Sequence, residues 1–193
     1  MINFPINASF PVIIVASPRT GSGALSWHIK NLHVGIEMFN EPDQASVKRL
    51  DEFLRFQKTD NNWILKIMIS SLDQYPDFIK DKINSGAYYR VKCSRRNLVD
   101  QIASHYVATI RDHWMYLKND PSDQYLDLPV VINTKIIDRC ISWINHDIKQ
   151  LKTFEADTEI FYEDVKNLLN SGTKKTPLPT NYEEIKAIIK QRL

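Results

Sequence analysis

Runs of β-branched, aromatic and other apolar residues alternate along the chain with stretches of helical periodicity. Such runs at 12–16, 34–39, 63–68, 87–93 and 158–162 predict five β-strands. Helical spacing covers 23–31, 43–56, 74–83 and 97–117, then a stretch ending at Leu151 and a last segment beginning near residue 181. This alternation is typical of an α/β protein with a central parallel sheet of about five strands and helices on both faces. With 193 residues and no internal repeat, we expect one domain spanning 1–193.

Two asparagines mark expected helix starts. Asn133 precedes a stripe of apolar residues at helical spacing, so its side chain is expected to cap that helix. Asn181 is followed three residues later by Glu184, which resembles a capping box at the start of the last helix. The stripe after Asn133 consists of Ile136, Ile137, Cys140, Ile141, Ile144, Ile148 and Leu151.

Parallel sheets bind ligands beyond the carboxyl ends of their strands. The loops to inspect are therefore 17–23, 40–43, 70–73 and 94–97, which follow the first four predicted strands. This rule selects the loops before any motif is considered.

The first of these loops, Ser17–Gly23, has the composition of an anion cradle. It joins a strand to a helix N-terminus, where backbone N–H groups and the helix dipole favour negative charge. Gly21 and Gly23 permit close approach of the backbone, and Arg19 adds a guanidinium fork suited to phosphate oxygens. The alternative is an ordinary strand-to-helix turn. Further donors in the loop are the hydroxyls of Thr20 and Ser22.

The same loop lacks the lysine of nucleotide-hydrolysing enzymes. In those proteins the last glycine of the loop is followed by Lys and then Ser or Thr, whereas Gly23 is followed by Ala24 and Leu25. The loop therefore fits a phosphate that is held but not hydrolysed.

A second basic cluster follows the fourth predicted strand. Arg95 and Arg96 come directly after the strand and before a helix, and Ser104 lies eight residues after Arg96, about two helical turns on. Two positive charges at a helix N-terminus are unfavourable unless an anion compensates them. Two anion sites on adjacent loops would suit a nucleotide with separated phosphates.

With these motifs the chain resembles the sulfotransferases that use 3′-phosphoadenosine 5′-phosphosulfate (PAPS). Residues 18–22, Pro-Arg-Thr-Gly-Ser, match the family's loop for the 5′-phosphosulfate, and Arg96 with Ser104 matches its Arg–Ser pair for the 3′-phosphate. Residues 161–165 look like its Tyr-Glu-Asp-Leu segment, and 173–185 look like the basic tail of bacterial, viral and carbohydrate sulfotransferases. The resemblance implies the P-loop-containing nucleotide hydrolase-like (sulfotransferase) fold.

The resemblance also implies a set of site residues. Gly23 departs from the family, which usually has a second Ser or Thr there, and the tail lacks the Arg-Lys-Gly triplet of cytosolic relatives, so Lys174 and Lys175 are assigned in its place. Arg19 is expected to act both in binding and in catalysis. The residues expected to bind PAPS, or its product adenosine 3′,5′-bisphosphate (PAP), are Pro18, Arg19, Thr20, Gly21, Ser22, Gly23, Ala24, Arg96, Ser104, Lys174 and Lys175.

Sulfuryl transfer to a hydroxyl requires a base and positive charge near the leaving phosphate. Glu41, in a Glu-Pro pair like that of carbohydrate sulfotransferases, is the first candidate base, and Glu37 is its rival. Lys66 lies in an apolar strand, where it either stabilises the transferring group or extends from an edge strand to solvent. His105, beside Ser104, is interpreted as structural.

Composition limits the remaining classes. The net charge of +2 does not by itself indicate nucleic-acid binding, and no apolar run approaches the roughly 20 residues of a membrane span. Cys93 and Cys140 form no Cys-x-x-Cys pair, so buried thiols are expected rather than a metal site. We expect a cytoplasmic enzyme without a metal, acting on a small-molecule, carbohydrate or peptide acceptor, with a homodimer possible. The alternatives are a magnesium-dependent small-molecule kinase and a non-catalytic nucleotide-binding module.

Overall fold

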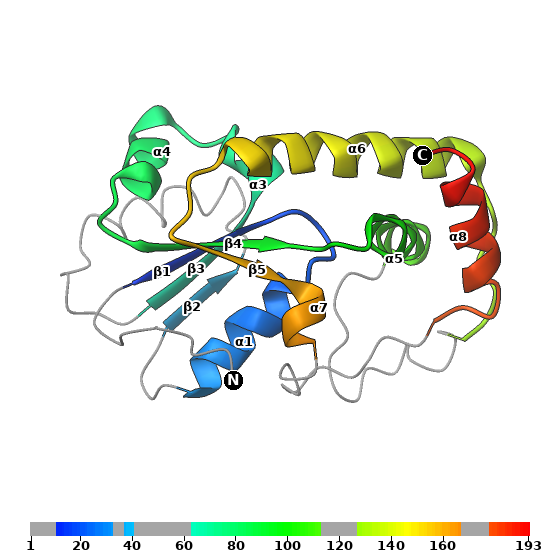
Figure 1. Ribbon diagram of the computed structural model, residues 1–193, viewed down its shortest axis with the longest axis horizontal. Coiled ribbons are helices and arrows are strands. Elements are labelled where there is room, and N and C mark those ends of the chain that lie inside the picture. The colour runs from blue at the N-terminus through cyan, green and yellow to red at the C-terminus, as the bar shows by residue number, and fades with distance from the viewer. Residues whose placement is uncertain (1–10, 33–36, 41–62, 113–126, 167–177) are drawn as a thin grey trace.

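The central sheet has five strands in the order β2-β3-β1-β4-β5, and every neighbouring pair is parallel (Figure 1). A computed structural model describes residues 11–32, 37–40, 63–112, 127–166 and 178–193. The expected α/β class with a parallel sheet is confirmed. The strands are β1 (Val12–Ala16), β2 (Glu37–Asn40), β3 (Trp63–Met68), β4 (Tyr89–Ser94) and β5 (Thr158–Phe161).

The described helices follow the predicted pattern with one clear difference in where a helix begins. The segment expected as one helix over 74–83 begins later, at Asp77, because Pro76 disfavours helical geometry in the residue before it. A separate short turn, Ile69–Leu72, follows β3 directly. The helices are α1 (Ser22–Leu32), α3 (Ile69–Leu72), α4 (Asp77–Asn84), α5 (Leu98–Arg111), α6 (Thr134–Thr153), α7 (Tyr162–Val165) and α8 (Tyr182–Lys190).

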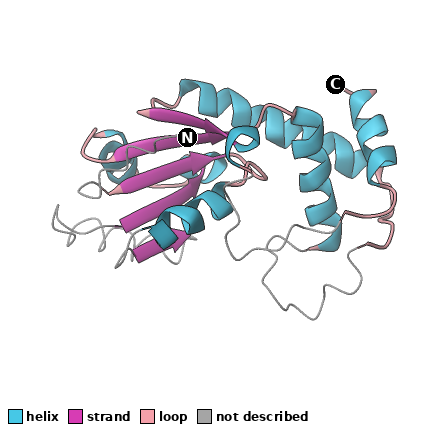
Figure 2. Cartoon of the chain, turned by 60° about the horizontal axis from the view of Figure 1, so that its bottom comes forward, coloured by secondary structure: helices cyan, strands magenta, loops and turns pink. Residues whose placement is uncertain are grey.

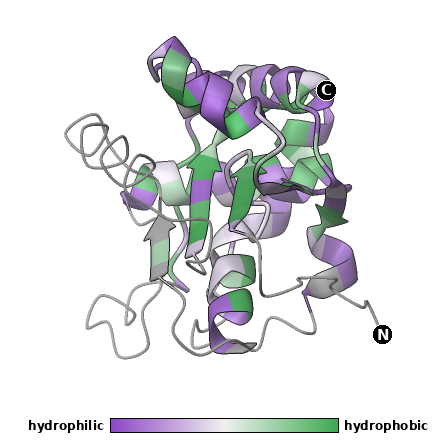
Figure 3. Ribbon diagram, turned by 90° about the vertical axis from the view of Figure 1, so that its left-hand side faces the viewer, coloured by the Kyte–Doolittle hydropathy of each residue, from purple (hydrophilic) through white to green (hydrophobic). Residues whose placement is uncertain are grey.

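Alternate residues of the strands face two apolar layers. One face packs Ile13, Leu65 and Ile67 against α3, α4 and the C-terminal end of α6. The other packs Ile14 and Ile64 against α1. In Figure 1 these helices lie above and below the sheet, and Figure 3 shows largely hydrophobic central strands, whereas the helices alternate hydrophobic and hydrophilic residues.

A third apolar cluster lies beyond the carboxyl ends of the strands. It is formed by α5, α6 and α8, and it includes Tyr106, Ile144 and Ile185. In Figure 2 the strand arrowheads point toward this group of helices. The carboxyl edge of the sheet, where the predicted binding loops lie, is therefore flanked by helices from the second half of the chain.

The two predicted helix caps have different outcomes. Asn133 caps α6 as expected, because its side chain accepts a hydrogen bond from the N–H of Ile136. The capping box at Asn181 is wrong, since its side chain makes no cap hydrogen bond. It instead accepts from the N–H of Val130 at 3.1 Å and donates to the Val130 carbonyl at 2.9 Å. Asn181 thus joins the start of α8 to the segment before α6.

Several expectations fall outside the described residues. These are the helix over 43–56 and the positions of Glu41, Lys174 and Lys175. The helix predicted over 97–117 is shorter than expected, because α5 ends at Arg111 and Asp112 has a left-handed φ of 50°. Within the described part of the chain, none of the helices has the length and apolar character needed to cross a bilayer. Cys93 and Cys140 are both buried free thiols, as expected.

Candidate functional site

The loop between β1 and α1 contains two residues with a left-handed backbone conformation, separated by Thr20. Arg19 has φ of 63°, and Gly21 has φ of 75°. Glycine adopts this conformation readily, but an arginine does so at a cost of about 1 kcal/mol, so its surroundings must hold it. The loop is thereby bent sharply around the first turn of α1, where Ser22 and Gly23 supply the first N–H groups of the helix.

Contacts from neighbouring elements fix the base of this loop. The Thr20 hydroxyl donates to the Ser17 carbonyl at 3.0 Å, and the Cys93 thiol donates to the Thr20 carbonyl at 3.2 Å. From α5, the Gln101 amide donates to the Pro18 carbonyl at 2.8 Å and to the Ser17 hydroxyl. The Thr20 hydroxyl, which the sequence predicts as a donor to a ligand, here donates to the backbone of the loop itself.

Lys66 brings a positive charge to the N-terminus of α1. It lies on β3, which is an inner strand, so extension from an edge strand is wrong. Its side chain is only 8% exposed, and its Nζ lies 3.8 Å from where a Cβ on Gly23 would be. The absence of a side chain at Gly23 thus leaves space between the lysine and the helix N-terminus.

Arg19 reaches across the loop to α5. Its Nε donates to the Ser104 hydroxyl at 2.9 Å, so the expected serine does lie at the site, but beside Arg19. His105 is buried next to it and packs edge-on against Trp143 at 5.4 Å between ring centroids. Burial, with a smaller contribution from the Arg19 charge, lowers the pKa of His105 to about 4. The ring is neutral at pH 7.

Arg96 does not contact Ser104 through any hydrogen bond among the described residues. Its guanidinium makes a two-bond ion pair with Asp164, at 2.5 and 2.7 Å, and lies 4.1 Å from the centroid of the Phe161 ring. The Glu163 carboxylate accepts the N–H groups of Arg96 and Asn97. The anions that compensate the arginine pair at the start of α5 are therefore carboxylates of the chain itself.

Burial alone would raise the pKa of Glu163. The N–H groups of Asn97 and Arg96, together with the Arg95 charge, outweigh burial and lower it. Hydrogen bonds from Arg96 likewise lower the pKa of Asp164. Both carboxylates stay ionised at neutral pH and hold α7 against the start of α5.

The two glutamates proposed as base differ in position. Glu37 begins β2 in register with Trp63, at the opposite edge of the sheet from the loop, and its side chain lies outside the described residues. Asn40, at the end of β2, is level with Lys66. Glu41 follows Asn40 in the chain and is itself outside the described residues.

Three residues at the site were missed in the sequence. Gln101 lies one helical turn before Ser104, and that spacing was a signal that both face the loop. Tyr162 packs its ring against Gly21, where an added Cβ would lie 2.5 Å from Cδ2. Arg95 donates to the Arg19 carbonyl at 3.3 Å. The adjacent Arg96 drew the sequence assignment because its spacing to Ser104 matched a motif.

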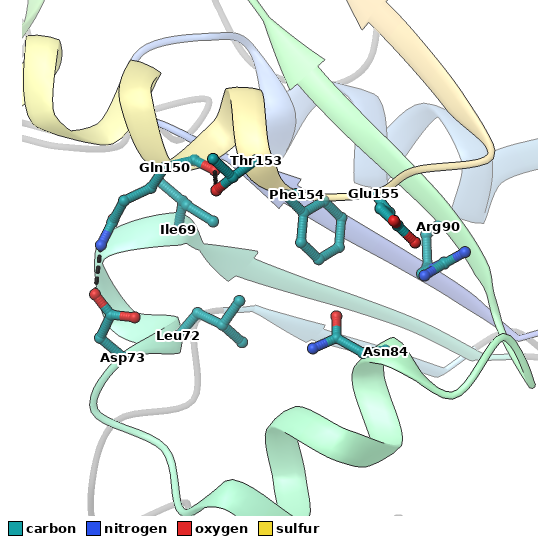
Figure 4. Close-up of a pocket in the computed structure, with 9 residues that line it drawn as sticks. All are labelled: Ile69, Leu72, Asp73, Asn84, Arg90, Gln150, Thr153, Phe154 and Glu155. Atoms are coloured by element: carbon teal, nitrogen blue, oxygen red, sulfur yellow. Dashed lines mark hydrogen bonds between the residues drawn. The ribbon is translucent and has the colours of Figure 1, made fainter.

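A separate pocket of about 360 Å³ lies on the opposite face of the sheet, between α3, α4 and α6. Figure 4 shows apolar Leu72 and Phe154 beside polar Asn84, with Gln150 hydrogen-bonded to Asp73. The sheet separates this pocket from Lys66 and the N-terminus of α1. Among residues that the structure describes, no group of three His, Cys, Asp or Glu side chains is arranged to hold a metal ion.

Comparisons with known proteins give little direct evidence. No protein-family model matches the sequence, and no curated protein matches it. Among solved structures, one similar chain is mouse sulfotransferase SULT7A1 complexed with PAP, at 15% sequence identity and a TM-score of 0.46. The match covers 94% of this chain, which spans 64% of the length of that one. A likeness of this degree does not decide what the present chain binds.

Proposed function

We propose that this chain is a sulfotransferase that moves a sulfuryl group from PAPS to a hydroxyl or amine acceptor. The carrying observation is the pairing of Lys66 with the N-terminal turn of α1 across Gly23, where the Nζ lies 3.8 Å from the Cβ position. Arg19 lies on the same loop, in contact with Ser104. Cationic side chains and helix N–H groups on one loop would suit a tetrahedral anion, which supports the proposal.

The residues present fit the 5′ end of such a nucleotide. The N–H groups of Ser22 and Gly23 and the side chains of Arg19 and Lys66 would hold the 5′-phosphate and its sulfuryl group. A side chain at position 23 would fill this space, and the glycine leaves it open. Where the family usually has the hydroxyl of a Ser or Thr, this chain therefore has open space through which the Lys66 ammonium can reach the anion.

When bound, PAPS would supply an activated sulfuryl group attached to its 5′-phosphate. Glu41 would accept the proton of the acceptor hydroxyl. Arg19 and Lys66 would stabilise the negative charge on the departing 5′-phosphate of PAP. Glu41 takes this role rather than Glu37 because it follows the end of β2, which is level with Lys66.

The second phosphate is held less directly than the resemblance implies. Arg96 already pairs with Asp164, so a 3′-phosphate would have to replace that carboxylate or rely on Ser104 and the tail lysines Lys174 and Lys175. We therefore propose that the protein binds the 5′ side of the nucleotide more strongly than the 3′-phosphate.

A second candidate is a magnesium-dependent kinase of a small molecule. Lys66 favours it, because an ammonium beside a phosphate loop performs the task of the missing loop lysine. The two functions differ in their donor, since a kinase requires ATP with Mg²⁺ and a sulfotransferase uses PAPS in the presence of EDTA.

The test is transfer of labelled sulfate from PAPS to a panel of phenolic, carbohydrate and peptide hydroxyls in EDTA. We expect a labelled product with at least one class of acceptor. Glu41→Gln should reduce transfer at least about 100-fold while retaining nucleotide binding, since base catalysis typically contributes 10²–10⁴-fold. Glu37→Gln is the matched control and should stay active. Transfer of phosphate from ATP, with none of sulfate from PAPS, would replace this proposal with the kinase.

A further inference from the structure

Arg95, at the edge of the candidate site, contacts residues of three other elements of the fold. Its Nη1 donates to the Arg19 carbonyl at 3.3 Å. Its Nη2 lies 3.7 Å from Asp100 and its Nε 3.8 Å from Glu163, while the face of the guanidinium lies 4.9 Å from the Tyr162 ring centroid. The side chain is 15% exposed. The guanidinium thus makes one hydrogen bond, two ion pairs and one contact with an aromatic ring inside the protein.

These contacts meet the loop at its two left-handed residues. Arg95 holds the carbonyl of Arg19, whose φ of 63° is unfavourable for a residue with a side chain. The Tyr162 ring, which lies beneath the Arg95 cation, occupies the space that a Cβ on Gly21 would need. The pair Arg95 and Tyr162 therefore supports both left-handed residues of the loop, and we call this pair the brace.

The brace is anchored on the helices of the second half of the chain. Asp100 forms an ion pair with Arg95 through Oδ2, 3.7 Å from Nη2, and another with Lys186 of α8 through Oδ1, 3.0 Å from Nζ. Lys186 also pairs with Glu183. The charge of Arg95 is balanced by these carboxylates, so its role is mechanical rather than that of an anion ligand.

Arg96 is a natural contrast. It has the same charge and is the next residue, yet its side chain is 51% exposed and pairs with Asp164 on the surface. Its ion pair joins α7 to the start of α5, and among the described residues no hydrogen bond or ion pair joins it to the Ser17–Gly23 loop.

We propose that Arg95 is the positioning residue of the Ser17–Gly23 loop. By fixing the Arg19 carbonyl and the Tyr162 ring, it directs the Arg19 side chain toward Ser104 and orients the first N–H groups of α1. Arg96, which the sequence favoured, does not order the loop. The ligand-binding part of this inference rests on the proposed function, whereas the ordering of the loop does not.

The first test compares Arg95→Lys with Arg96→Lys without any ligand. Both variants keep the net charge, but lysine lacks the planar fork and face that the brace uses. We expect hydrogen exchange of the Gly21, Ser22 and Gly23 amides to accelerate at least tenfold in Arg95→Lys and to stay unchanged in Arg96→Lys. Amides of α4, which lies on the far face of the sheet, serve as the internal reference. Equal loop exchange in the two variants would overturn the proposal.

The second test separates positioning from direct ligand contact. Calorimetry measures the affinities of PAP and of adenosine 5′-phosphate for each variant. A misoriented loop lowers the affinities of both ligands by the same factor, at least about tenfold. The ratio of the two affinities is therefore unchanged in Arg95→Lys. If Arg95 contacted the 3′-phosphate, only PAP would weaken, and the positioning role would be wrong. Weakening by Arg96→Lys but not by Arg95→Lys would also overturn it.

Tyr162 supplies an independent variant in case Arg95→Lys folds poorly. Tyr162→Phe keeps the ring and should behave as the parent protein in both tests. Tyr162→Leu removes the stack and should reproduce the Arg95→Lys loop exchange. If Leu and Phe give the same loop exchange, the ring does not brace the loop. If wild type binds neither nucleotide, the proposed function fails, but the exchange data still decide whether Arg95 orders the loop.

Discussion

Asp147 and His105 are buried titratable groups with opposite effects on stability. Asp147, on α6, is 0% exposed, and neither carboxylate oxygen has a hydrogen-bond partner within the described structure. Burial, only partly offset by the charge of His146, raises the pKa of Asp147 from 3.8 to about 6. Burial lowers the pKa of His105 from 6.5 to about 4.

The two shifts act in the same pH window with opposite signs. Between pH 4 and 6 the unfolded chain loses the Asp147 proton before the folded protein does, so the free energy of unfolding falls by about 3 kcal/mol as pH rises. Over nearly the same range the unfolded chain holds the His105 proton that the folded protein does not, so stability rises with pH by a similar amount. The two contributions nearly cancel in the parent protein.

We therefore predict that replacing either residue alone makes the free energy of unfolding depend more steeply on pH. Asp147→Asn should become more stable by about 3 kcal/mol between pH 4.5 and 7.5, since only the His105 contribution remains. His105→Gln should lose a similar amount over the same range. Urea unfolding followed by tryptophan fluorescence at several pH values measures these slopes. The slope carries the test, because a buried amide at position 147 also lacks partners and changes the absolute stability.

Carboxylates whose pKa is lowered, such as Glu163 and Asp164, act below this window. Their stabilisation is lost only as pH falls through their folded pKa values, below their ordinary range. If Asp147→Asn has the same pH slope as the parent protein, Asp147 is not held in a desolvated site and this account of α6 is wrong.

Further predictions concern the loop. Gly21→Ala should destabilise the protein by about 2 kcal/mol or more, because position 21 has a left-handed backbone and the added Cβ would lie 2.5 Å from the Tyr162 ring. Gly23→Ala, with only an ordinary 3.8 Å contact to Lys66, should raise stability by about 0.5–1 kcal/mol, and denaturant titration distinguishes the two. Lys66→Met should weaken PAP binding at least about tenfold, because it removes the ammonium beside the N-terminus of α1; unchanged affinity would exclude Lys66 from the anion site.

The first half of the site was readable in the sequence because local signals agreed. A β-branched run ending in glycines and hydroxyls marked the strand, the turn and the helix N-terminus. Lys66 stood out because a lysine within an apolar strand needs a reason to be there. The order of strands, which makes β3 an inner strand, was needed to decide what that reason is.

The second half depended on contacts between residues far apart in the chain. Nothing local distinguishes Arg95 from Arg96, and the carboxylates that separate their roles lie on α7, more than 60 residues later. Asn181 carried a capping pattern but is used by the Val130 backbone instead. Asp147 interrupts an apolar stripe and has no hydrogen-bond partner among the described residues. Only its burial in the folded protein shows that its pKa is raised.

The central claim is that the Ser17–Gly23 loop, with Arg19 and Lys66, holds the 5′ end of a PAPS-type nucleotide. Isothermal titration calorimetry in EDTA, with PAP and ATP as separate titrants, tests it most directly. The account predicts binding of PAP without a metal, at least tenfold tighter than ATP, and loss of that binding in Lys66→Met. Binding of ATP only when Mg²⁺ is added, with no heat from PAP, would contradict it.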